Sequence, residues 1–455
     1  MATIQSINPY TEEINAEIEL VSETEIDQVI DEAHEAFLTW KQTSFDERKA
    51  LFLQLADELE KDIEECSRLQ TLEMGMLYTD SKAGMEKTVE LIRWFANHAE
   101  EILGEKSYKT DDGFEGIELY DSLGVIFGIA PWNFPFNQLL RAAVPNILAG
   151  NTQIYKHASS VPLCAKKIQS LFDNAGFPKG IYSNVFVSSR LSEHIISNPK
   201  IAGVNLTGSE RAGSAVGALA GKYLKPSILE LGGNDAFVVC DIKNIDAAVE
   251  VAVNSRMRNG GQGCNSSKRV IILEKYYDEF CEKYAQKMSE RIPGDPFDPA
   301  TTLQPLSSQG AVDEIDTQVQ RAIQSGARVL IGGQKMDKKG FFYPTTVLAD
   351  VTPEVSSFHE EIFGPVASLI KSSSIEHSIE LANNSEFGLS AVAYGDDTDQ
   401  VTQVAKKLKG GMVFINQGAS SKASIPFGGT GKSGYGKENG PEGLKAFANK
   451  KVIVF

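Results

Sequence analysis

From residue 124 onward, short apolar runs of strand length alternate with segments that have the apolar periodicity of helices. One series extends from "GVIFGIA" at 124–130 to "SILEL" at 227–231, and another begins with "NDAFVVC" at 234–240. Because parallel strands need long crossover connections, usually helices, this rhythm predicts parallel sheets covered by helices. A chain of 455 residues is too long for one hydrophobic core, so two α/β domains are expected.

The segments outside this alternation have other patterns. The first hundred residues are predicted to be helical, and Ser22 with Glu25 forms a capping-box pattern ahead of the first amphipathic run. Residues 105–121 are predicted to form two short strands around an Asp-Asp-Gly turn, and "KKVIVF" at 450–455 a terminal strand. Such strand edges can join the sheet of another subunit, so we expect a homodimer or homotetramer.

The net charge of the chain excludes two classes of partner. A formal net charge of −17 and a pI near 5.0 give a surface that repels nucleic acids and anionic membranes. No signal peptide and no apolar stretch of the ~20 residues that span a bilayer are seen. Five irregularly spaced cysteines favour the reducing cytoplasm over a disulfide framework. The histidines lack zinc-ligand spacing, so no metal site is expected.

One cysteine stands out by its surroundings. Cys264 lies in "NGGQGCNSSKR", a polar glycine-rich turn, whereas the other four cysteines lie in helix-like or apolar runs. Glycines allow a backbone to approach a ligand closely, and a thiol among polar groups is expected to be ionisable and accessible. Cys264 is therefore a candidate nucleophile in a flexible turn.

Three other motifs supply groups that a nucleophile needs. Glu230 in "LELGG" follows an apolar strand, where a carboxylate should have a raised pKa suited to a general base. Asn133 in "APWNFPF" lies in an exposed loop fixed by two prolines and could donate to an oxyanion. At 207–209, "TGS" joins a strand to a helix, and such a helix N-terminus can bind phosphate.

Six motifs together resemble the aldehyde dehydrogenase superfamily in order and spacing. The resemblance extends from "INPYTEEI" near the N-terminus to the last strand, which is nearly the whole chain. The motifs are PWNFP at 131–135, TGS at 207–209, LELGG at 229–233, GQGC at 261–264, EEIFGPV at 360–366 and PFGG at 426–429.

This resemblance implies a catalytic mechanism. Cys264 would form a thiohemiacetal with an aldehyde, and the Asn133 side chain and the Cys264 backbone N–H would hold its oxyanion. Hydride transfer to a nicotinamide would leave a thioester, from which Glu230 would release the acid by activating water. Glu438 in "GKENG" matches a second acid that relays protons.

The resemblance also implies the domains and the cofactor contacts. A Rossmann-type cofactor domain would comprise 1–104 and 122–232, and a second α/β catalytic domain 233–430. A small β oligomerisation arm at 105–121 and a C-terminal segment at 431–455 would complete the fold. The expected cofactor-binding residues are Trp132, Lys156, Ser159, Thr207, Gly208, Ser209, Leu231, Glu361 and Phe363.

Substrate and cofactor preference follow from the same comparison. Arg141 and Arg258 resemble the arginine pair with which the succinate-semialdehyde dehydrogenase branch holds the substrate carboxylate, and Ser421, another expected substrate-binding residue, resembles the shorter bacterial members of that branch. NAD-preferring relatives often carry a glutamate at the position of Ser159, so a serine beside Lys156 favours NADP over NAD.

Two other functions stay open. One is a dehydrogenase of broader aliphatic aldehydes, and the other is a catalytically silent structural relative, which the intact Cys264 and Glu230 disfavour. A CoA-acylating relative is disfavoured because that branch lacks a glutamate at the position of Glu230.

Overall fold

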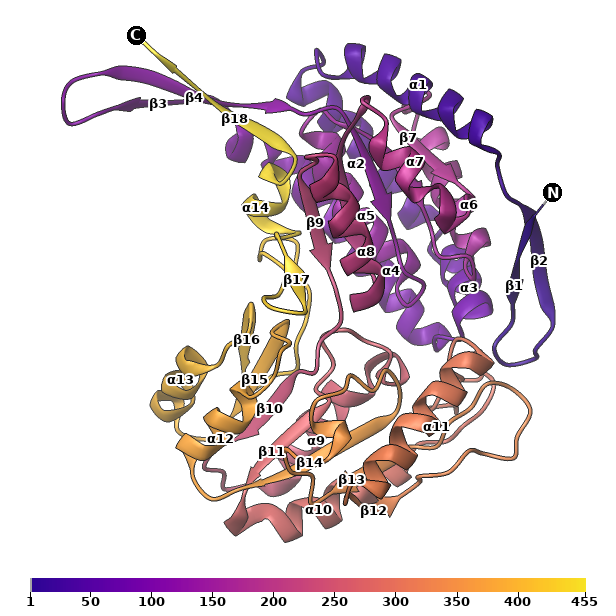
Figure 1. The fold of residues 1–455 in the computed structure, drawn as a ribbon, viewed down its shortest axis with the longest axis vertical. Helices are drawn as coiled ribbons and strands as arrows, with labels where there is room; N and C mark the ends of the chain where they lie inside the picture. Colours follow the sequence, from indigo (N-terminus) through magenta and orange to yellow (C-terminus); the bar gives the residue numbers. More distant parts are fainter. Residues whose placement is uncertain (1) are drawn as a thin grey trace.

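The computed structural model describes residues 2–455 and contains two large, mainly parallel sheets (Figure 1). The first has six strands in the order β17-β9-β8-β5-β6-β7, and only β17 runs antiparallel to its neighbour. Its strands are β5 (Val125–Ile129), β6 (Thr152–Lys156), β7 (Tyr182–Val185), β8 (Ile201–Thr207), β9 (Ser227–Glu230) and β17 (Gly434–Tyr435).

Helices cover both faces of this first sheet, which explains why most residues of its central strands are buried. Ile154 and Tyr155 are neighbours on β6 but lie in different hydrophobic clusters, because successive side chains of a strand point to opposite faces. One face packs on α1 (Glu23–Trp40), α7 (Ser192–Ser197) and α8 (Glu210–Lys222). The other packs on α2 (Phe45–Lys61), α3 (Ile63–Met74), α4 (Tyr78–Leu103), α5 (Pro135–Leu148) and α6 (Pro162–Asn174).

The second sheet has seven strands in the order β12-β13-β14-β11-β10-β15-β16, with only β12 antiparallel. Its strands are β10 (Ala236–Val239), β11 (Arg269–Leu273), β12 (Arg328–Ile331), β13 (Thr346–Ala349), β14 (Val366–Ser372), β15 (Ser390–Tyr394) and β16 (Met412–Ile415). The helices on its two faces are α9 (Ile245–Met257) with α10 (Glu274–Ser289), and α11 (Gln309–Gln324) with α12 (Ile375–Asn383) and α13 (Thr398–Lys407). The predicted α/β fold class is therefore confirmed.

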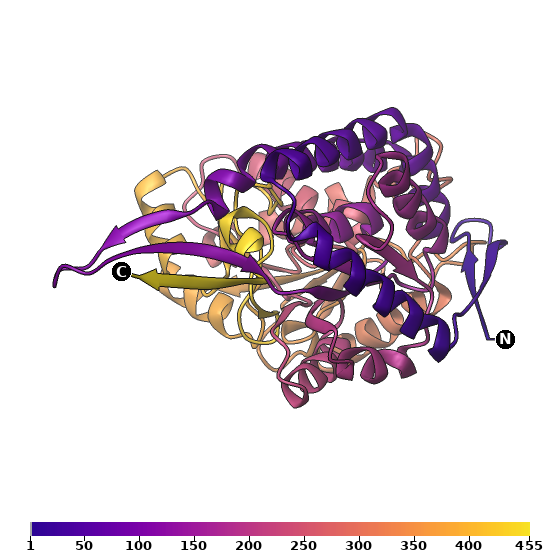
Figure 2. The same cartoon turned by 90° about the horizontal axis from the view of Figure 1, so that it is seen from above.

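A narrow three-stranded arm extends from the body of the molecule (Figure 2). It consists of β3 (Lys106–Lys109), β4 (Glu115–Ser122) and β18 (Ala448–Val454), and β18 pairs antiparallel with β4 along its whole length. The two strands predicted around the Asp-Asp-Gly turn and the predicted terminal strand are thus present in one sheet.

The helical prediction for the first hundred residues was correct from α1 onward and wrong before it. The capping box is formed, with the Ser22 N–H donating to Glu25 Oε2 at 2.7 Å. The preceding residues form a hairpin of β1 (Thr3–Ile7) and β2 (Ile14–Glu19) instead. Its residues are mostly exposed or half-buried, so the hairpin lacks the apolar face by which a strand is recognised in a sequence.

The chain passes directly from one sheet to the other at a single short connection. Glu230 ends β9, Ala236 begins β10, and only residues 231–235 lie between them. The C-terminal segment returns to the first sheet through β17 and through α14 (Gly440–Lys445), which packs against α5. Within residues 2–455, no helix has the length and apolar character that a membrane span requires.

Candidate active site

Cys264 lies in a turn between α9 and β11, at the junction of the two sheets. The turn follows the 3-10 segment η2 (Arg258–Gly261), in which Asn259, Gly260 and Gly261 have positive φ values of 53°, 61° and 80°. A Cβ at position 261 would overlap the Gly364 carbonyl, so this glycine is required by close approach as well as by conformation.

The turn is not the flexible, exposed segment that its composition suggested. Asn259 and Gln262 are almost completely buried, and the Asn259 side chain donates to the Asn133 carbonyl at 3.0 Å. Cys264 itself is half-buried, and this burial raises the pKa of its thiol to about 11. Arg141 and Lys268 lower that pKa, but less than burial raises it. Burial of the thiol thus opposes the ionisation that the polar composition of the turn predicted.

Asn133 lies directly against the cysteine turn. It follows β5 and precedes α5, whose first residue is Pro135, and its side chain is buried and not exposed as predicted. Its Nδ2 donates to the Gln262 carbonyl at 3.0 Å, which leaves its second amide hydrogen free to donate elsewhere. Among residues 2–455 the backbone N–H of Cys264 has no acceptor. These two donors are available to a developing oxyanion.

Glu230 is a buried carboxyl group at the end of β9. Neither of its oxygens has a hydrogen-bond partner within residues 2–455, and desolvation together with the charge of Glu438 raises its pKa well above the usual value. Arg141 and Lys437 act in the opposite direction. Gly428 of the PFGG motif borders the Glu230 side chain closely enough that a Cβ there would overlap Oε1.

The predicted substrate arginine and the predicted second acid form one ion pair. Arg141 Nε lies 2.6 Å from Glu438 Oε2, and both side chains are buried. Asn205 also donates to Glu438, at 3.2 Å. Arg141 Nη2 is buried without a partner within residues 2–455, and the guanidinium lies 4.1 Å from the centre of the Phe427 ring. The Arg141 guanidinium thus uses Nε to pair with Glu438, and its Nη2 can still donate to a ligand.

Arg258 and Ser421 lie on the more open side of the site. The Arg258 side chain is exposed, stacks at 5.3 Å over the Phe134 ring and donates weakly to the Ala419 carbonyl at 3.4 Å. Desolvation lowers the pKa of Arg258, and the charges of Cys264 and Arg141 also act on it. The two arginines and the cysteine therefore share one neighbourhood. Ser421 accepts a hydrogen bond of 2.9 Å from Asn439.

The residues expected to hold a dinucleotide line the ends of β6 and β8. Lys156 ends β6, and burial lowers its pKa because its ammonium has no acceptor within residues 2–455. Ser159 is exposed a few residues later. Ser209 is the N-cap of α8, and the Gly208 N–H donates to the Glu230 carbonyl at 2.9 Å, with Thr207 buried beside it. An unpaired cation at the end of β6 and a helix N-terminus after β8 both fit a phosphate-bearing cofactor.

The residues predicted to face the nicotinamide, Glu361 and Phe363, lie on another loop near the cysteine turn. Glu361 Oε1 accepts from the Gly233 N–H at 3.0 Å, and the Phe363 ring lies 5.9 Å from the Trp132 ring, edge to face. Leu231 is buried between Glu230 and these glycines.

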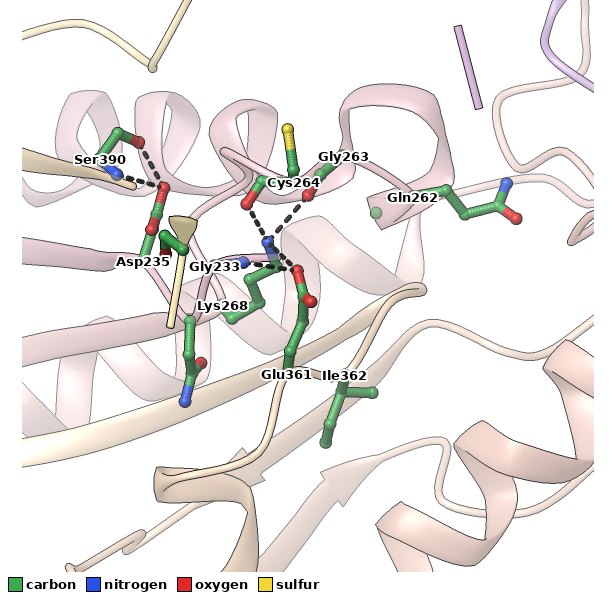
Figure 3. A network of polar contacts seen from close by, with 12 residues as sticks. Gly233, Asp235, Gln262, Gly263, Cys264, Lys268, Glu361, Ile362 and Ser390 are labelled. Carbon is green, nitrogen blue, oxygen red and sulfur yellow. Dashed lines mark hydrogen bonds and ion pairs between the residues drawn. The ribbon is translucent and has the colours of Figure 1, made fainter. Parts of the chain in front are cut away.

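Sequence reasoning missed Lys268, which Figure 3 shows at the centre of the polar contacts below Cys264. Its ammonium lies 3.0 Å from Glu361 Oε1 and contacts the carbonyls of the cysteine turn. The only signal was its place four residues after Cys264, before an apolar strand, where a charged side chain must be compensated. Among residues 2–455 no group of three or more His, Cys, Asp or Glu side chains could hold a metal ion.

Comparison with known proteins gives a consistent picture. The sequence profile described as "Aldehyde dehydrogenase family" matches residues 1–453. A succinate-semialdehyde dehydrogenase [NADP(+)] of Deinococcus radiodurans is 39% identical over 448 residues, which is 98% of this chain and 94% of the relative. The succinate-semialdehyde dehydrogenase [NADP(+)] 1 of Mycobacterium tuberculosis strain H37Rv is 38% identical over 454 residues, 99% of each protein.

Solved structures are equally similar. The crystal structure of succinic semialdehyde dehydrogenase from Streptococcus pyogenes in complex with NADP+ has a TM-score of 0.97 and 37% identity, and covers 99% of both chains. The succinate-semialdehyde dehydrogenase of Burkholderia pseudomallei has a TM-score of 0.95 and 32% identity, and covers 100% of this chain and 94% of its own.

The raised pKa of the Cys264 thiol has a direct test. Because only the thiolate reacts with iodoacetamide, the alkylation rate of the ligand-free protein should rise about tenfold per pH unit from about pH 7 to pH 9, without a plateau. The rate is measured by loss of activity or by mass spectrometry, with Cys264→Ala subtracting the four buried cysteines. A plateau below about pH 8 would contradict the assigned protonation state.

Proposed function

The chain belongs to the aldehyde dehydrogenase family, and we propose that it oxidises succinate semialdehyde to succinate with NADP as the hydride acceptor. The observation that carries the substrate assignment is the pair of guanidinium groups beside Cys264, one of which keeps a buried nitrogen without a partner. The relatives named above are succinate-semialdehyde dehydrogenases, which supports the same substrate.

The first chemical step is the addition of Cys264 to the aldehyde. The thiol loses its proton, the sulfur bonds to the carbonyl carbon, and the carbonyl oxygen becomes an oxyanion. The free N–H of Asn133 and the backbone N–H of Cys264 would donate hydrogen bonds to this oxyanion. When bound, the nicotinamide supplies a hydride acceptor for the thiohemiacetal carbon, whose oxidation leaves a thioester on Cys264.

The second step is hydrolysis of the thioester. Glu230 takes a proton from water, whose oxygen attacks the thioester carbon, and the sulfur leaves as the thiolate. The burial that raises the pKa of Glu230 makes it a stronger base once it is ionised. The buried Glu438 lies close enough to act on this pKa, so it could exchange the proton with Glu230 or with solvent.

The cofactor preference rests on Lys156 and Ser159. A 2′-phosphate would give the Lys156 ammonium the acceptor it lacks within residues 2–455, and the exposed Ser159 hydroxyl can donate to the same group. The other proposed cofactor contacts come from two places. Thr207, Gly208 and Ser209 lie at the end of β8, and Glu361 and Phe363 lie on the loop after η3.

The substrate carboxylate needs a local positive site, because the chain carries a net charge of −17. Arg258 offers an exposed guanidinium, and Arg141 offers Nη2 while Glu438 neutralises its Nε side. A planar guanidinium matches a carboxylate better than an ammonium does. Ser421, held by Asn439, could add a hydroxyl to this clamp.

The β arm is the proposed site of assembly into a homodimer or homotetramer. Val452, Val454 and Phe455 are 45%, 56% and 76% exposed on β18 and the residue after it, and the outer edge of β18 is unpaired. An exposed apolar strand edge is stabilised by pairing with another chain. A cytoplasmic location is proposed because all five cysteines are unpaired thiols.

Replacing Arg258 with alanine tests the carboxylate clamp. The KM for succinate semialdehyde should rise about tenfold or more, since the contact is made in ground and transition states alike and the group is partly solvated. Oxidation of butanal, which has no carboxylate, should change little. The exposed Arg68→Ala on α3 is the matched control. If the wild-type enzyme oxidises butanal as efficiently as succinate semialdehyde, the broader aliphatic function replaces this one.

Replacing Glu230 with glutamine tests the division of labour between base and nucleophile. The variant should give a burst of NADPH close to one equivalent per site and then turn over about 100-fold more slowly, because the thioester forms but is not hydrolysed. In the wild-type enzyme the steady-state rate should rise with pH as Glu230 ionises, and this rise should disappear in the variant. Stopped-flow absorbance measures both, and a variant without a burst would assign Glu230 to an earlier step.

Replacing Ser159 with glutamate tests the cofactor assignment. The new carboxylate would repel a 2′-phosphate beside Lys156, so kcat/KM for NADP should fall about 30-fold or more while that for NAD is kept or rises. Ser159→Ala, which adds no charge, should have a much smaller effect. A wild-type enzyme that prefers NAD tenfold, measured as the ratio of kcat/KM values, would exclude the assignment.

A further inference from the structure

Lys268 is a buried cation with an unusually complete set of partners. Its side chain is 3% exposed. Its Nζ donates to the Gly263 carbonyl at 2.8 Å and to the Cys264 carbonyl at 2.5 Å, and lies 3.0 Å from Glu361 Oε1. These three acceptors match the three hydrogens of an ammonium group, so none is left for substrate or solvent. Lys268 therefore acts through its neighbours.

The contact with the Gly263 carbonyl fixes the orientation of a peptide group. A trans peptide is planar, so its carbonyl and its N–H point in opposite directions. Lys268 holds the Gly263 oxygen at 2.8 Å and the Ser266 N–H donates to the same oxygen at 3.2 Å, so the N–H of Cys264 must point away from Lys268. Figure 3 shows the Cys264 sulfur on the side opposite the Lys268 ammonium. A cation on the carbonyl also polarises the peptide and strengthens its N–H as a donor.

The contact with Glu361 fixes Lys268 itself. Glu361 Oε1 accepts from the Gly233 N–H as well, so one carboxylate joins the 361 loop, the β9–β10 connection and the cysteine turn. Gly232 and Gly233 leave the space for this arrangement, since a Cβ at 233 would lie 3.0 Å from the Cys264 carbonyl oxygen and one at 232 would overlap Glu361. The Phe363 ring lies 5.8 Å from Nζ.

We propose that Lys268 is a positioning residue that holds the Gly263–Cys264 peptide so that the Cys264 N–H faces the oxyanion of the bound aldehyde. The inference rests on the proposed function, because it assigns that oxyanion to the N–H of Cys264. Asp235, whose backbone carbonyl accepts from the Lys268 N–H at 3.0 Å, anchors the other end of the residue.

The charge of Lys268 has a second effect that an experiment must separate from positioning. Cationic groups at the thiol lower its pKa and carboxylates raise it, so removing Lys268 leaves less thiolate at neutral pH. The charged groups facing Cys264 are Arg141 on α5, Arg258 on η2, Lys268 before β11, Asp235 before β10 and Glu361 after η3 (Ser356–Phe358).

Two reactions of the same thiol separate the effects. Alkylation of the ligand-free protein by iodoacetamide displaces iodide at a saturated carbon and forms no oxyanion, so its rate reports the thiolate alone. The NADPH burst requires an oxyanion on the substrate and so reports the donors as well. In Lys268→Met we expect alkylation near neutral pH to slow about threefold to tenfold, and the burst to slow at least tenfold more than alkylation.

A conservative variant keeps the test decisive if Lys268→Met folds poorly. Lys268→Arg retains the charge but cannot direct three donors from one nitrogen. Its alkylation rate and pH profile should stay near wild type, while its burst slows about tenfold with little change in aldehyde KM. Lys225→Met, which removes a half-buried lysine remote from the site, is the control and should match wild type in both reactions. Thermal melting confirms that each variant is folded.

The outcomes discriminate clearly. A burst that slows more than alkylation in Lys268→Met supports positioning. If Lys268→Met does not fold, the same difference in Lys268→Arg supports it. Equal slowing of both reactions overturns the proposal and leaves only a charge effect, and unchanged rates overturn it altogether. The comparison uses whichever aldehyde gives a wild-type burst. An error in the proposed substrate therefore appears as an absence of NADPH formation by the wild-type enzyme with succinate semialdehyde, and not as a changed ratio.

Discussion

The site depends on how closely separate stretches of backbone approach one another at the junction of the two sheets. Gly261 lies against the Gly364 carbonyl, Gly232 against Glu361, and Gly428 against Glu230, and in each case a Cβ would overlap its neighbour. A methyl group at any of these positions would separate a loop that carries a reacting group from the loop that supports it. The glycines of GQGC, LELGG and PFGG therefore set the distances between the loops that carry Cys264, Glu230 and Glu361.

The same close approach brings buried charged side chains into contact with one another. Arg141 and Glu438 neutralise each other at 2.6 Å, and Lys268 and Glu361 do so at 3.0 Å. Glu230 has no such partner within residues 2–455, and it is the group proposed to change its proton during each turnover. Burying a carboxylate without a partner costs free energy. Glu230 is buried in this way, at the position where the proposed mechanism needs a group that gains and loses a proton.

Much of this arrangement could be predicted from the sequence, and the reasons are local. Strand–helix alternation predicts the parallel sheets, and Cys264 and Glu230 stand out because their residue types contrast with their own neighbours. The two buried ion pairs were missed because their partners are far apart in the chain. Glu438 lies 297 positions from Arg141, and Glu361 reaches Lys268 from a distant loop. The burial of the Cys264 thiol was missed for the same reason, because it comes from loops that its own turn does not contain.

The raised pKa of the Cys264 thiol also bears on how long the protein lasts. Peroxide oxidises a thiolate to a sulfenic acid far faster than it oxidises a thiol, and further oxidation is irreversible. Asn265 follows the nucleophile, so no neighbouring cysteine could intercept a sulfenic acid as a disulfide. A buried thiol whose pKa is raised carries little thiolate at neutral pH and is spared most of this damage. Slow oxidation of Cys264 by peroxide is thus a consequence of the same desolvation that raises its pKa and slows its other reactions as a thiolate.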